Sequence, residues 1–386
     1  MILNYIWKNI SGWTNYSGIV ISHLMNENEM GNRGSKSKLN NFVKEQRADG
    51  NWWIKIIHFR CALMGCENSY RIKFPSKQLI LIKKFSTLNS PFKLNEWFIT
   101  GITDSEGSFT VMLDKNINRT LGWRIQSKFQ IGLHVRDLDL LLQIQEFFGI
   151  GSIGKSEKMA FYSVSSVKDL TNIIIPHFKK YTLLTQKAAD FLLFTKIVEL
   201  MTKKEHLSIE GLHKIINIKA SMNLGLSENL KSEFKNINPI DRPIINIKNI
   251  NHPNWITGFV NGEGTFDVKI YKSNTKIGFA VQLRFRIPQH ERDIKLIELI
   301  KKYFGSGSIE KHTKFPAVTL VIVKFSIITE KVIPFFKQYP LIGIKQLDFL
   351  DFCKIAKLTD DDYHLTIEGL KLIRIIKSGM NTGRKL

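Results

Sequence analysis

Cysteine is scarce in this chain, which contains Cys61, Cys66 and Cys353 among its 386 residues. Three scattered cysteines cannot form the disulfide framework of a small secreted domain, so a reducing compartment fits the sequence better. Cys61 and Cys66 lie near His58, but their spacing is loose and a fourth ligand is missing. The sequence therefore gives no support for a zinc site.

Acidic residues are also in deficit, with 34 Asp and Glu against 56 Lys and Arg and a formal net charge of +22. This excess of positive charge indicates a polyanionic partner. No uninterrupted apolar run reaches the roughly 18 residues of a membrane-spanning helix, so nucleic acid is favoured over a membrane. The sequence also lacks a Walker loop, a Ser/His/Asp pattern and a His-Asn-His arrangement, which leaves those chemistries without an anchor.

One stretch of the sequence occurs twice, because Trp97–Phe109 returns as Trp255–Phe266. In each copy an apolar helical run ends at a glutamate followed by a helix-stopping glycine, and a short alternating strand begins there. Further matches follow at a nearly constant offset, such as residues 148–153 against 304–309. We interpret the chain as a duplicated domain.

Each copy of the helical run carries a pair of small residues, which would allow the two helices to pack backbone to backbone. Side by side, the helices would bring Glu106 and Glu263 together at two negative helix ends. Such a concentration of charge favours a divalent metal ion. The small pairs expected at the interface are Thr100-Gly101 and Thr257-Gly258.

The two stretches resemble the LAGLIDADG motif of homing endonucleases in the single-chain form with two motifs, at Ile99–Gly107 and Ile256–Gly264. The resemblance covers residues 94–383. It implies an α+β fold of two pseudo-symmetric αββαββα domains, packed through their motif helices, with antiparallel DNA-binding sheets. At the sixth motif position Asp104 is matched by Asn261, which keeps a hydrogen-bonding cap but removes one charge.

The resemblance also implies a catalytic site. The acids at the eighth motif position, Glu106 and Glu263, would hold Mg²⁺ with help from the backbone carbonyls of Ser105 and Gly262. Metal ions held by carboxylates activate water and neutralise charge at the phosphorus, as phosphodiester hydrolysis requires. The family cuts both strands across the minor groove and leaves short 3′ overhangs.

Three further residues resemble parts of the family's active site. The glutamine near the attacking water would be Gln289, whereas the matching place in the first half holds Leu133, so the two sites would be unequal. Lys187 and Lys345 occupy matching positions before the last core helix of each half. These lysines either offset charge in the transition state or lie on the surface.

The strands that follow each motif alternate between apolar and polar residues, the period of a sheet with one wet face. The wet face offers Arg, Gln and Lys, which donate to base edges and phosphates, and a two-stranded ribbon fits the major groove. Helices Asp137–Phe148 and Asp293–Phe304 come next, each starting at an aspartate that suits an N-cap. The candidate DNA-binding residues are Ser108, Thr110, Arg124, Gln126, Lys128, Gln130, Thr265, Asp267, Lys269, Tyr271, Gln282, Arg284 and Arg286.

We expect four parts: a weakly ordered leader over residues 1–93, a first domain over 94–225, a linker over 226–250 and a second domain over 251–386. The leader resembles the in-frame segments that precede the endonuclease in fungal mitochondrial intron reading frames. Its first thirty residues contain no arginine, unlike a cleavable targeting peptide. The resemblance therefore implies a protein encoded and located in the mitochondrion.

The sequence favours a metal-dependent, site-specific double-strand DNA endonuclease that mobilises its own intron. It would act as a monomer, away from membranes, on a long asymmetric target. An RNA maturase of the same fold, which assists splicing of a group I intron with or without residual cleavage, is the alternative. A generic basic RNA-binding or ribosomal protein is disfavoured by the duplicated acidic motif.

Overall fold

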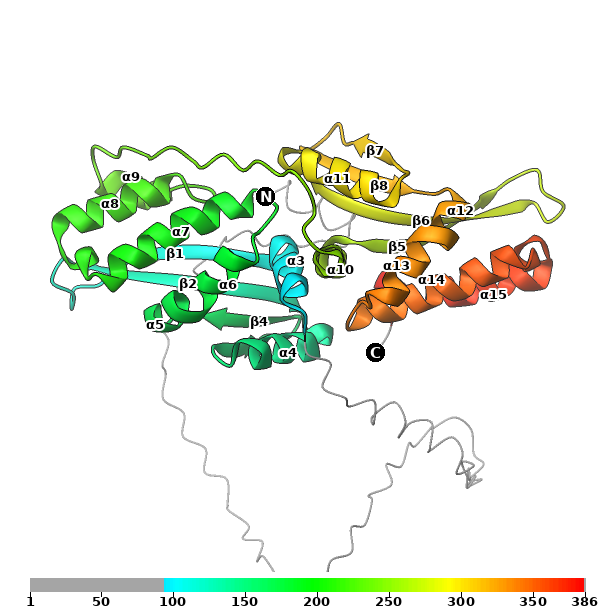
Figure 1. The fold of residues 1–386 in the computed structure, drawn as a ribbon, viewed down its shortest axis with the longest axis horizontal. Helices are drawn as coiled ribbons and strands as arrows, with labels where there is room; N and C mark the ends of the chain where they lie inside the picture. The colour runs from blue at the N-terminus through cyan, green and yellow to red at the C-terminus, as the bar shows by residue number, and fades with distance from the viewer. Residues whose placement is uncertain (1–93, 385–386) are drawn as a thin grey trace, which may run out of the picture. The chain divides into compact units, whose positions relative to one another are not determined.

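The computed structural model describes residues 94–384, which Figure 1 draws as a coloured ribbon. The predicted leader of residues 1–93, with His58, Cys61 and Cys66, lies outside the described residues. The described chain passes twice through the same order of helices and strands. This repetition confirms the duplication that the sequence predicts.

The first half begins at the motif helix α3 and ends with a short helix α9. Its elements are α3 Glu96–Glu106, β1 Gly107–Lys115, β2 Trp123–His134, η1 Val135–Asp137, α4 Leu138–Phe148, β3 Ser152–Lys155, β4 Met159–Val164, α5 Val167–Asp169, η2 Leu170–Ile174, α6 Ile175–Lys180, α7 Lys187–Thr202, η3 Glu205–Leu207, α8 Ile209–Ala220 and α9 Glu228–Glu233.

The second half begins at the other motif helix, α10, and runs to the end of the described chain. Its elements are α10 Pro253–Glu263, β5 Thr265–Lys272, β6 Phe279–His290, η4 Glu291–Asp293, α11 Ile294–Phe304, β7 Ser308–Lys311, β8 Ala317–Ile322, α12 Phe325–Ile327, η5 Ile328–Val332, α13 Ile333–Gln338, α14 Ile344–Asp360, η6 Tyr363–Leu365, α15 Ile367–Ser378 and η7 Asn381–Gly383.

Each half contains one four-stranded antiparallel sheet, with strand order β1-β2-β4-β3 in the first half and β5-β6-β8-β7 in the second. Helices α4 and α7 pack against the first sheet, and α11 and α14 pack against the second. Buried and less buried residues alternate along β1 and β2, so one face of the sheet meets the core. The α+β architecture expected from the sequence is confirmed.

A phenylalanine at the same place in each sheet organises each core. Phe109 lies within ring-contact distance of four other phenylalanines, and Phe266 has four equivalent neighbours in its own half. Both side chains are almost fully buried. Truncating such a residue to alanine costs ~3–5 kcal/mol, so these two residues are central to the stability of their halves.

A glycine follows the last residue of each motif helix, as the sequence predicts. Both glycines have extended backbone, since Gly107 has φ −80° and Gly264 has φ −70°. They are glycines because an added Cβ would crowd the preceding helical turn. Asp137 and Asp293 stand before α4 and α11 but make no capping hydrogen bond there. Their carboxylates accept from backbone N–H groups of the opposite half instead.

Helix α9 falls inside the segment predicted to be a linker. Leu226, Leu230 and Phe234 pack in the first core, while residues 235–252 form no helix or strand. Arg242 fixes this segment, since its guanidinium donates to both carboxylate oxygens of Asp190 at 2.6 and 2.9 Å.

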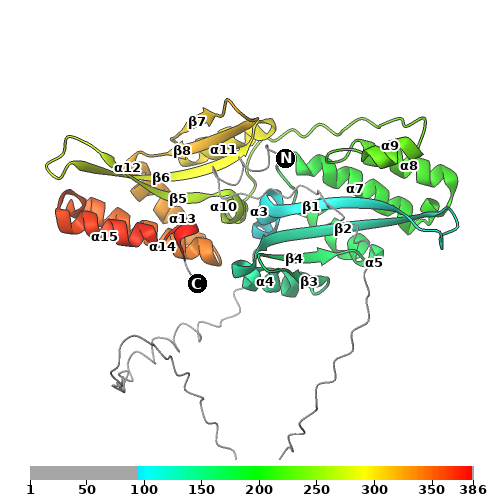
Figure 2. The same cartoon turned by 180° about the vertical axis from the view of Figure 1, so that it is seen from behind.

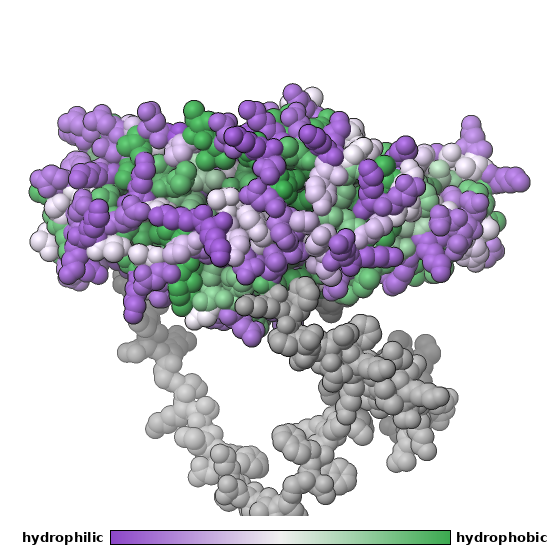
Figure 3. Space-filling view, viewed as in Figure 1, coloured by the Kyte–Doolittle hydropathy of each residue, from purple (hydrophilic) through white to green (hydrophobic). Residues whose placement is uncertain are grey.

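The surface of the described chain is predominantly hydrophilic on the face seen in Figure 3, with smaller apolar areas between the polar side chains. Within residues 94–384 there is no helix with the length and apolar character needed to cross a bilayer. The basic composition of the whole chain, 56 Lys and Arg against 34 Asp and Glu, agrees with such a surface.

Candidate active site at the motif helices

The motif helices α3 and α10 lie side by side (Figures 1 and 2), and their backbones meet at one glycine from each helix. A Cβ added to Gly101 would lie 2.7 Å from the backbone nitrogen of Phe259 and would overlap with the carbonyl oxygen of Trp255. A Cβ on Gly258 would lie 2.9 Å from the backbone nitrogen of Ile102. A side chain at either position would therefore force the two helices apart.

The threonines beside these glycines tie each motif helix to its own half. Thr100 Oγ1 donates to the carbonyl oxygen of Tyr181 at 3.0 Å, and Thr257 Oγ1 donates to that of Tyr339 at 3.2 Å. These tyrosines follow α6 and α13 at equivalent places. Each small pair thus combines a close helix contact with an anchor to the domain behind it.

Glu106 and Glu263 are the last residues of α3 and α10; Glu263 is buried and Glu106 is partly exposed. Burial raises the pKa of both carboxyls. The charge of Glu106 raises the pKa of Glu263 further, whereas Lys187 and Lys345 act to lower both. Two interacting carboxylates at two negative helix ends form a site that a divalent cation would stabilise.

The available donors fit a hard cation such as Mg²⁺, which prefers oxygen ligands. They are the carboxylates of Glu106 and Glu263 with the backbone carbonyls of Ser105 and Gly262 near the same helix ends. Across residues 94–384 there is no cluster of three or more His, Cys, Asp or Glu side chains arranged for a metal. A cation at this site would therefore complete its shell with carbonyl, water or phosphate oxygens.

Two lysines reach the same helix ends from α7 and α14. Lys187 Nζ donates to the carbonyl oxygens of Ser105 at 2.6 Å and Thr103 at 3.3 Å. Lys345 Nζ donates to the carbonyl oxygen of Gly264. Burial lowers the pKa of both ammonium groups, and nearby carboxylates act to raise it again. The lysines are thus partly buried cations beside the ends of the motif helices.

The seventh residues of the two motifs, Ser105 and Gly262, face each other, and the space between them holds only one side chain. A Cβ added to Gly262 would lie 2.6 Å from the Cβ of Ser105 and 3.0 Å from the Cγ of Glu106. Ser105 occupies this space, and its Oγ donates to the carbonyl oxygen of Ile102 at 2.9 Å. The equivalent positions of the two motifs therefore fit together only because one of them lacks a side chain.

Asp104 is the centre of a buried network that the sequence left unassigned. Its carboxylate accepts from the backbone N–H groups of Leu184 at 2.8 Å and Thr185 at 3.0 Å, and from Thr185 Oγ1. It also accepts from Trp255 Nε1 of the opposite motif helix at 2.8 Å. Burial raises the pKa of Asp104, and the hydrogen bonds oppose that shift. The counterpart Asn261 accepts from Ile342 N at 2.9 Å, so the interface is asymmetric.

Gln289 lies near the end of β6, where its side-chain oxygen accepts from the backbone N–H of His290 at 2.8 Å. The matching Leu133 is buried at the end of β2. The two halves therefore differ at this position, one polar and one apolar.

The candidate DNA-binding residues line up across neighbouring strands on one face of each sheet. They alternate with the buried core residues, so their side chains share the face that the core does not cover. The opposed pairs are Ser108 with Gln130, Thr110 with Lys128, Asp114 with Arg124, Thr265 with Arg286, Asp267 with Arg284 and Lys269 with Gln282. Gln126 lies opposite Met112, and Tyr271 lies opposite Ala280.

Acidic residues hold the arginines on these faces. Asp267 accepts from Arg284, and the Arg286 guanidinium lies 3.4 Å from the same carboxylate. In the first sheet Arg124 pairs with Asp114 at 3.0 Å. The Nε atoms of Arg284 and Arg286 are themselves buried and have no hydrogen-bond partner in the described part of the chain. The ion pairs with Asp114 and Asp267 thus orient the arginines on the sheet faces.

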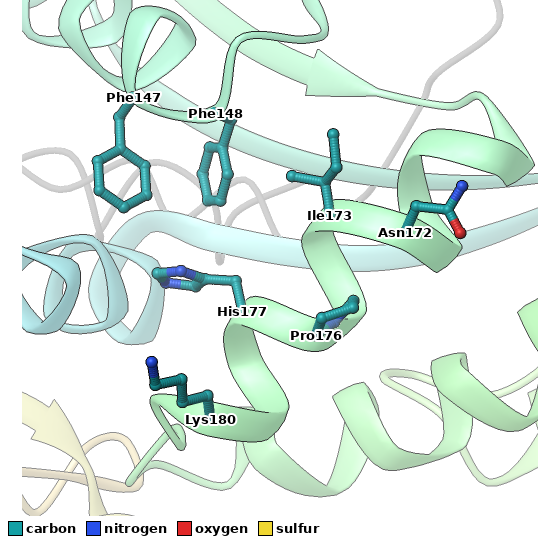
Figure 4. Close-up of a pocket in the computed structure, with 7 residues that line it drawn as sticks. All are labelled: Phe147, Phe148, Asn172, Ile173, Pro176, His177 and Lys180. Carbon is teal, nitrogen blue, oxygen red and sulfur yellow. The ribbon is translucent and has the colours of Figure 1, made fainter.

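A surface cavity of about 340 Å³ lies apart from this site, where the end of α4 faces η2 and α6 (Figure 4). Burial lowers the pKa of His177 in its wall to about 4, so this imidazole is neutral at pH 7. The lining includes neither the glutamates nor the paired lysines. It consists of Phe147, Phe148, Asn172, Ile173, Pro176, His177 and Lys180.

Comparison with known proteins places these features in a family. The model of the LAGLIDADG endonuclease family matches residues 99–198 and 256–356. The chain is 50% identical to the probable intron-encoded endonuclease 3 of Neurospora crassa, over 96% of this chain and 73% of that protein. It is 39% identical to the probable intron-encoded endonuclease 2 of the same fungus, over 74% of this chain and 65% of that protein.

Solved structures agree with this assignment. The homing endonuclease I-SmaMI bound to cleaved DNA is 46% identical, with a TM-score of 0.75 over 76% of this chain and 99% of that one. I-SmaMI bound to uncleaved DNA in the presence of calcium ions gives a TM-score of 0.74 at the same identity. The chain therefore belongs to the LAGLIDADG endonuclease family of DNA-cleaving hydrolases.

Proposed function

We propose that this protein is a site-specific homing endonuclease that cuts both strands of a long asymmetric DNA target at Glu106 and Glu263. The observation that carries the proposal is that these two carboxylates lie close to Lys187 and Lys345 at the ends of the motif helices. The DNA complexes of I-SmaMI, cleaved and uncleaved, support it.

The roles of the residues follow from phosphodiester hydrolysis. Glu106 and Glu263 bind Mg²⁺, with the carbonyls of Ser105 and Gly262 as further donors. When bound, the ion supplies Lewis acidity and an activated water at neutral pH. The chain itself holds the carboxylates in place through the packed motif helices, so the site needs little reorganisation on reaction.

The neighbouring side chains adjust charge and orientation. Lys187 and Lys345 offset negative charge that develops on the phosphate, since ammonium groups stabilise such charge strongly where water is excluded. Gln289 orients the attacking water in one site only, because Leu133 replaces it in the other. We therefore expect the two strands to meet unequal active sites.

The sheet faces read the DNA. Arginine donates to guanine O6 and N7, glutamine pairs with adenine, and lysine contacts phosphate, so the polar rows on the outer faces of both sheets suit major-groove contacts. The acids that orient Arg124, Arg284 and Arg286 limit the side-chain freedom that binding would otherwise remove. Target binding by this surface should weaken steeply with salt.

One chain supplies both motifs, so we propose that it acts as a monomer. We keep the domain boundaries expected from the sequence at residues 94–225, 226–250 and 251–386, with α9 at the start of the linker packed on the first domain. The intron-encoded relatives from a fungus support a mitochondrial gene and location. A role as an RNA maturase for a group I intron stays the alternative, because the same basic chain would bind RNA.

The test uses the full-length protein on DNA that carries the joined exon sequence flanking its gene. Discrete cleavage with Mg²⁺, lost with EDTA, is expected. Glu106→Gln or Glu263→Gln should abolish double-strand cleavage while target binding is largely retained. The exposed Glu157→Gln serves as the matched control and should cut normally.

Two results would contradict the proposal. Cleavage that persists in both glutamine variants would remove the carboxylates from the mechanism. No cleavage by the folded wild-type protein, together with tight binding of the intron RNA, would establish the maturase instead.

A further inference from the structure

The backbone immediately before Lys187 is held by two aspartates from different halves of the protein. Asp104 of α3 accepts from the N–H groups of Leu184 and Thr185. The next N–H, that of Gln186, donates to Asp293 Oδ1 of the second half at 2.8 Å. Three consecutive N–H groups at the start of α7 are thus bound by carboxylates.

The same arrangement occurs with the halves exchanged. Asn261 of α10 accepts from the N–H of Ile342, and Asp137 of the first half accepts from the N–H of Ile344 at 2.9 Å. Ile344 is the residue before Lys345. Each lysine is therefore preceded by a backbone N–H that is bound by an aspartate from the opposite half.

The geometry around these aspartates is specific. Asp293 is 3% exposed, and it ends a 3₁₀ turn whose start is held by His290 Nδ1, which accepts from the N–H of Arg292. At the other contact Gly343 has φ +69°, and a Cβ there would lie 2.5 Å from Asp137 Oδ1. Glycine at this position makes room for the carboxylate.

The first N–H groups of a helix have no partner within the helix, and a carboxylate there both satisfies them and complements the helix dipole. At the start of α7 the carbonyl of Gln186 also accepts from Arg242 of the interdomain segment at 3.1 Å. The peptide next to Lys187 is thus held on both sides by residues outside α7.

We propose that Asp293 and Asp137 are positioning residues that act across the domain interface, each fixing the helix start that directs the lysine of the opposite half toward the motif helices. This inference rests on the proposed function. It makes docking of the halves a condition for aligning Lys187 on Ser105 and Lys345 on Gly264.

A contact that only stabilises the interface would make different predictions. Loss of general stability would slow cleavage of both strands alike. Loss of lysine alignment would instead reproduce the strand preference of the corresponding lysine variant.

The test is single-turnover cleavage by the full chain on target DNA with each strand labelled separately. Asp293→Ala should slow the strand or strands slowed by Lys187→Met, by about 10- to 100-fold, because small misplacements of catalytic groups have effects of that size. Asp137→Ala should likewise slow the strand or strands slowed by Lys345→Met. Combining Asp293→Ala with Lys187→Met should add little, since both changes remove the same interaction.

The conservative variants are the matched controls. Asp293→Asn and Asp137→Asn keep an Oδ1 acceptor for the backbone N–H, so they should retain most of the rate that the alanine variants lose. Target binding should stay within about threefold of wild type in all four, since none of these residues lies on the sheet faces.

A structural measurement separates this inference from the proposed function. Amide hydrogen exchange around Gln186 should rise in Asp293→Ala but not in Asp137→Ala, and the reverse should hold around Ile344. A wild-type protein that does not cut would refute the proposed function. Wild-type cleavage with equal slowing of both strands in each aspartate variant, or alanine and asparagine variants that behave alike, would refute the positioning role alone.

Discussion

The close approach of the motif helices predicts that a single methyl group will disrupt the domain interface. In Gly101→Ala the new Cβ would stand 2.7 Å from the backbone nitrogen of Phe259, where an ordinary contact needs roughly 3.5–4.0 Å. The atoms that it meets are backbone, so the helices must separate by about 1 Å, and a gap of that size forfeits up to about half of each contact across it. We expect a loss of about 3 kcal/mol, the upper range for overpacking, after the small gain in helix propensity from alanine.

Thermal unfolding of the full chain measures this loss. A change of about 3 kcal/mol corresponds to a fall in Tm of roughly 6–12 °C for a domain of this size class. Gly154→Ala is the matched control, since a Cβ there meets nothing within 4 Å, and its stability should change by less than about 0.5 kcal/mol. If Gly101→Ala unfolded at the same temperature as Gly154→Ala, the backbone contact between α3 and α10 would be refuted.

Two further predictions concern buried charges. Arg242→Ala should destabilise the protein by about 3 kcal/mol in urea unfolding, because it strands the buried Asp190 carboxylate; Lys214→Ala, at an exposed ion pair, should change little. Burial raises the pKa of Asp293 from 3.8 to about 6, so the folded protein binds this proton more tightly than the unfolded chain. The contribution of this proton to the free energy of unfolding is therefore fully present below about pH 4 and is lost as the pH rises through 6. The total loss is about 3 kcal/mol, at 1.36 kcal/mol per pKa unit. Asp293→Asn should flatten this part of the pH–stability curve, and an unchanged slope would contradict the shift.

The fold was predictable because its main signals repeat. Alternation along the strands indicated one apolar face in each sheet, where the structure buries Phe109 and Phe266, and the same spacing in two copies indicated one architecture used twice. The short helix α9 escaped prediction. Its burial depends on Leu230 and Phe234 finding the first core, which is a tertiary event that local composition does not reveal.

The candidate site was predictable only in part. A glutamate in each motif indicated paired carboxylates, and the matching lysines were visible as a repeated position. The partners of Asp137 and Asp293 were not visible, because each bonds a backbone N–H, 207 and 107 residues away respectively, and every residue except proline carries such a group. Their position before α4 and α11 suggested that these aspartates cap those helices. They bind backbone N–H groups of the opposite half instead.

The shared space at Ser105 and Gly262 affects how the two copies can diverge. Copies of a duplicated gene usually accumulate substitutions independently, but here the size permitted at one position depends on the residue at the other. Gly262→Ser becomes sterically possible only after Ser105→Gly. The two positions are therefore coupled in evolution, although they lie 157 residues apart. When halves of such enzymes are recombined to change target preference, the residues at these two positions must be kept as a compatible pair. Two halves that each fold well would otherwise clash at this point and fail to pack together.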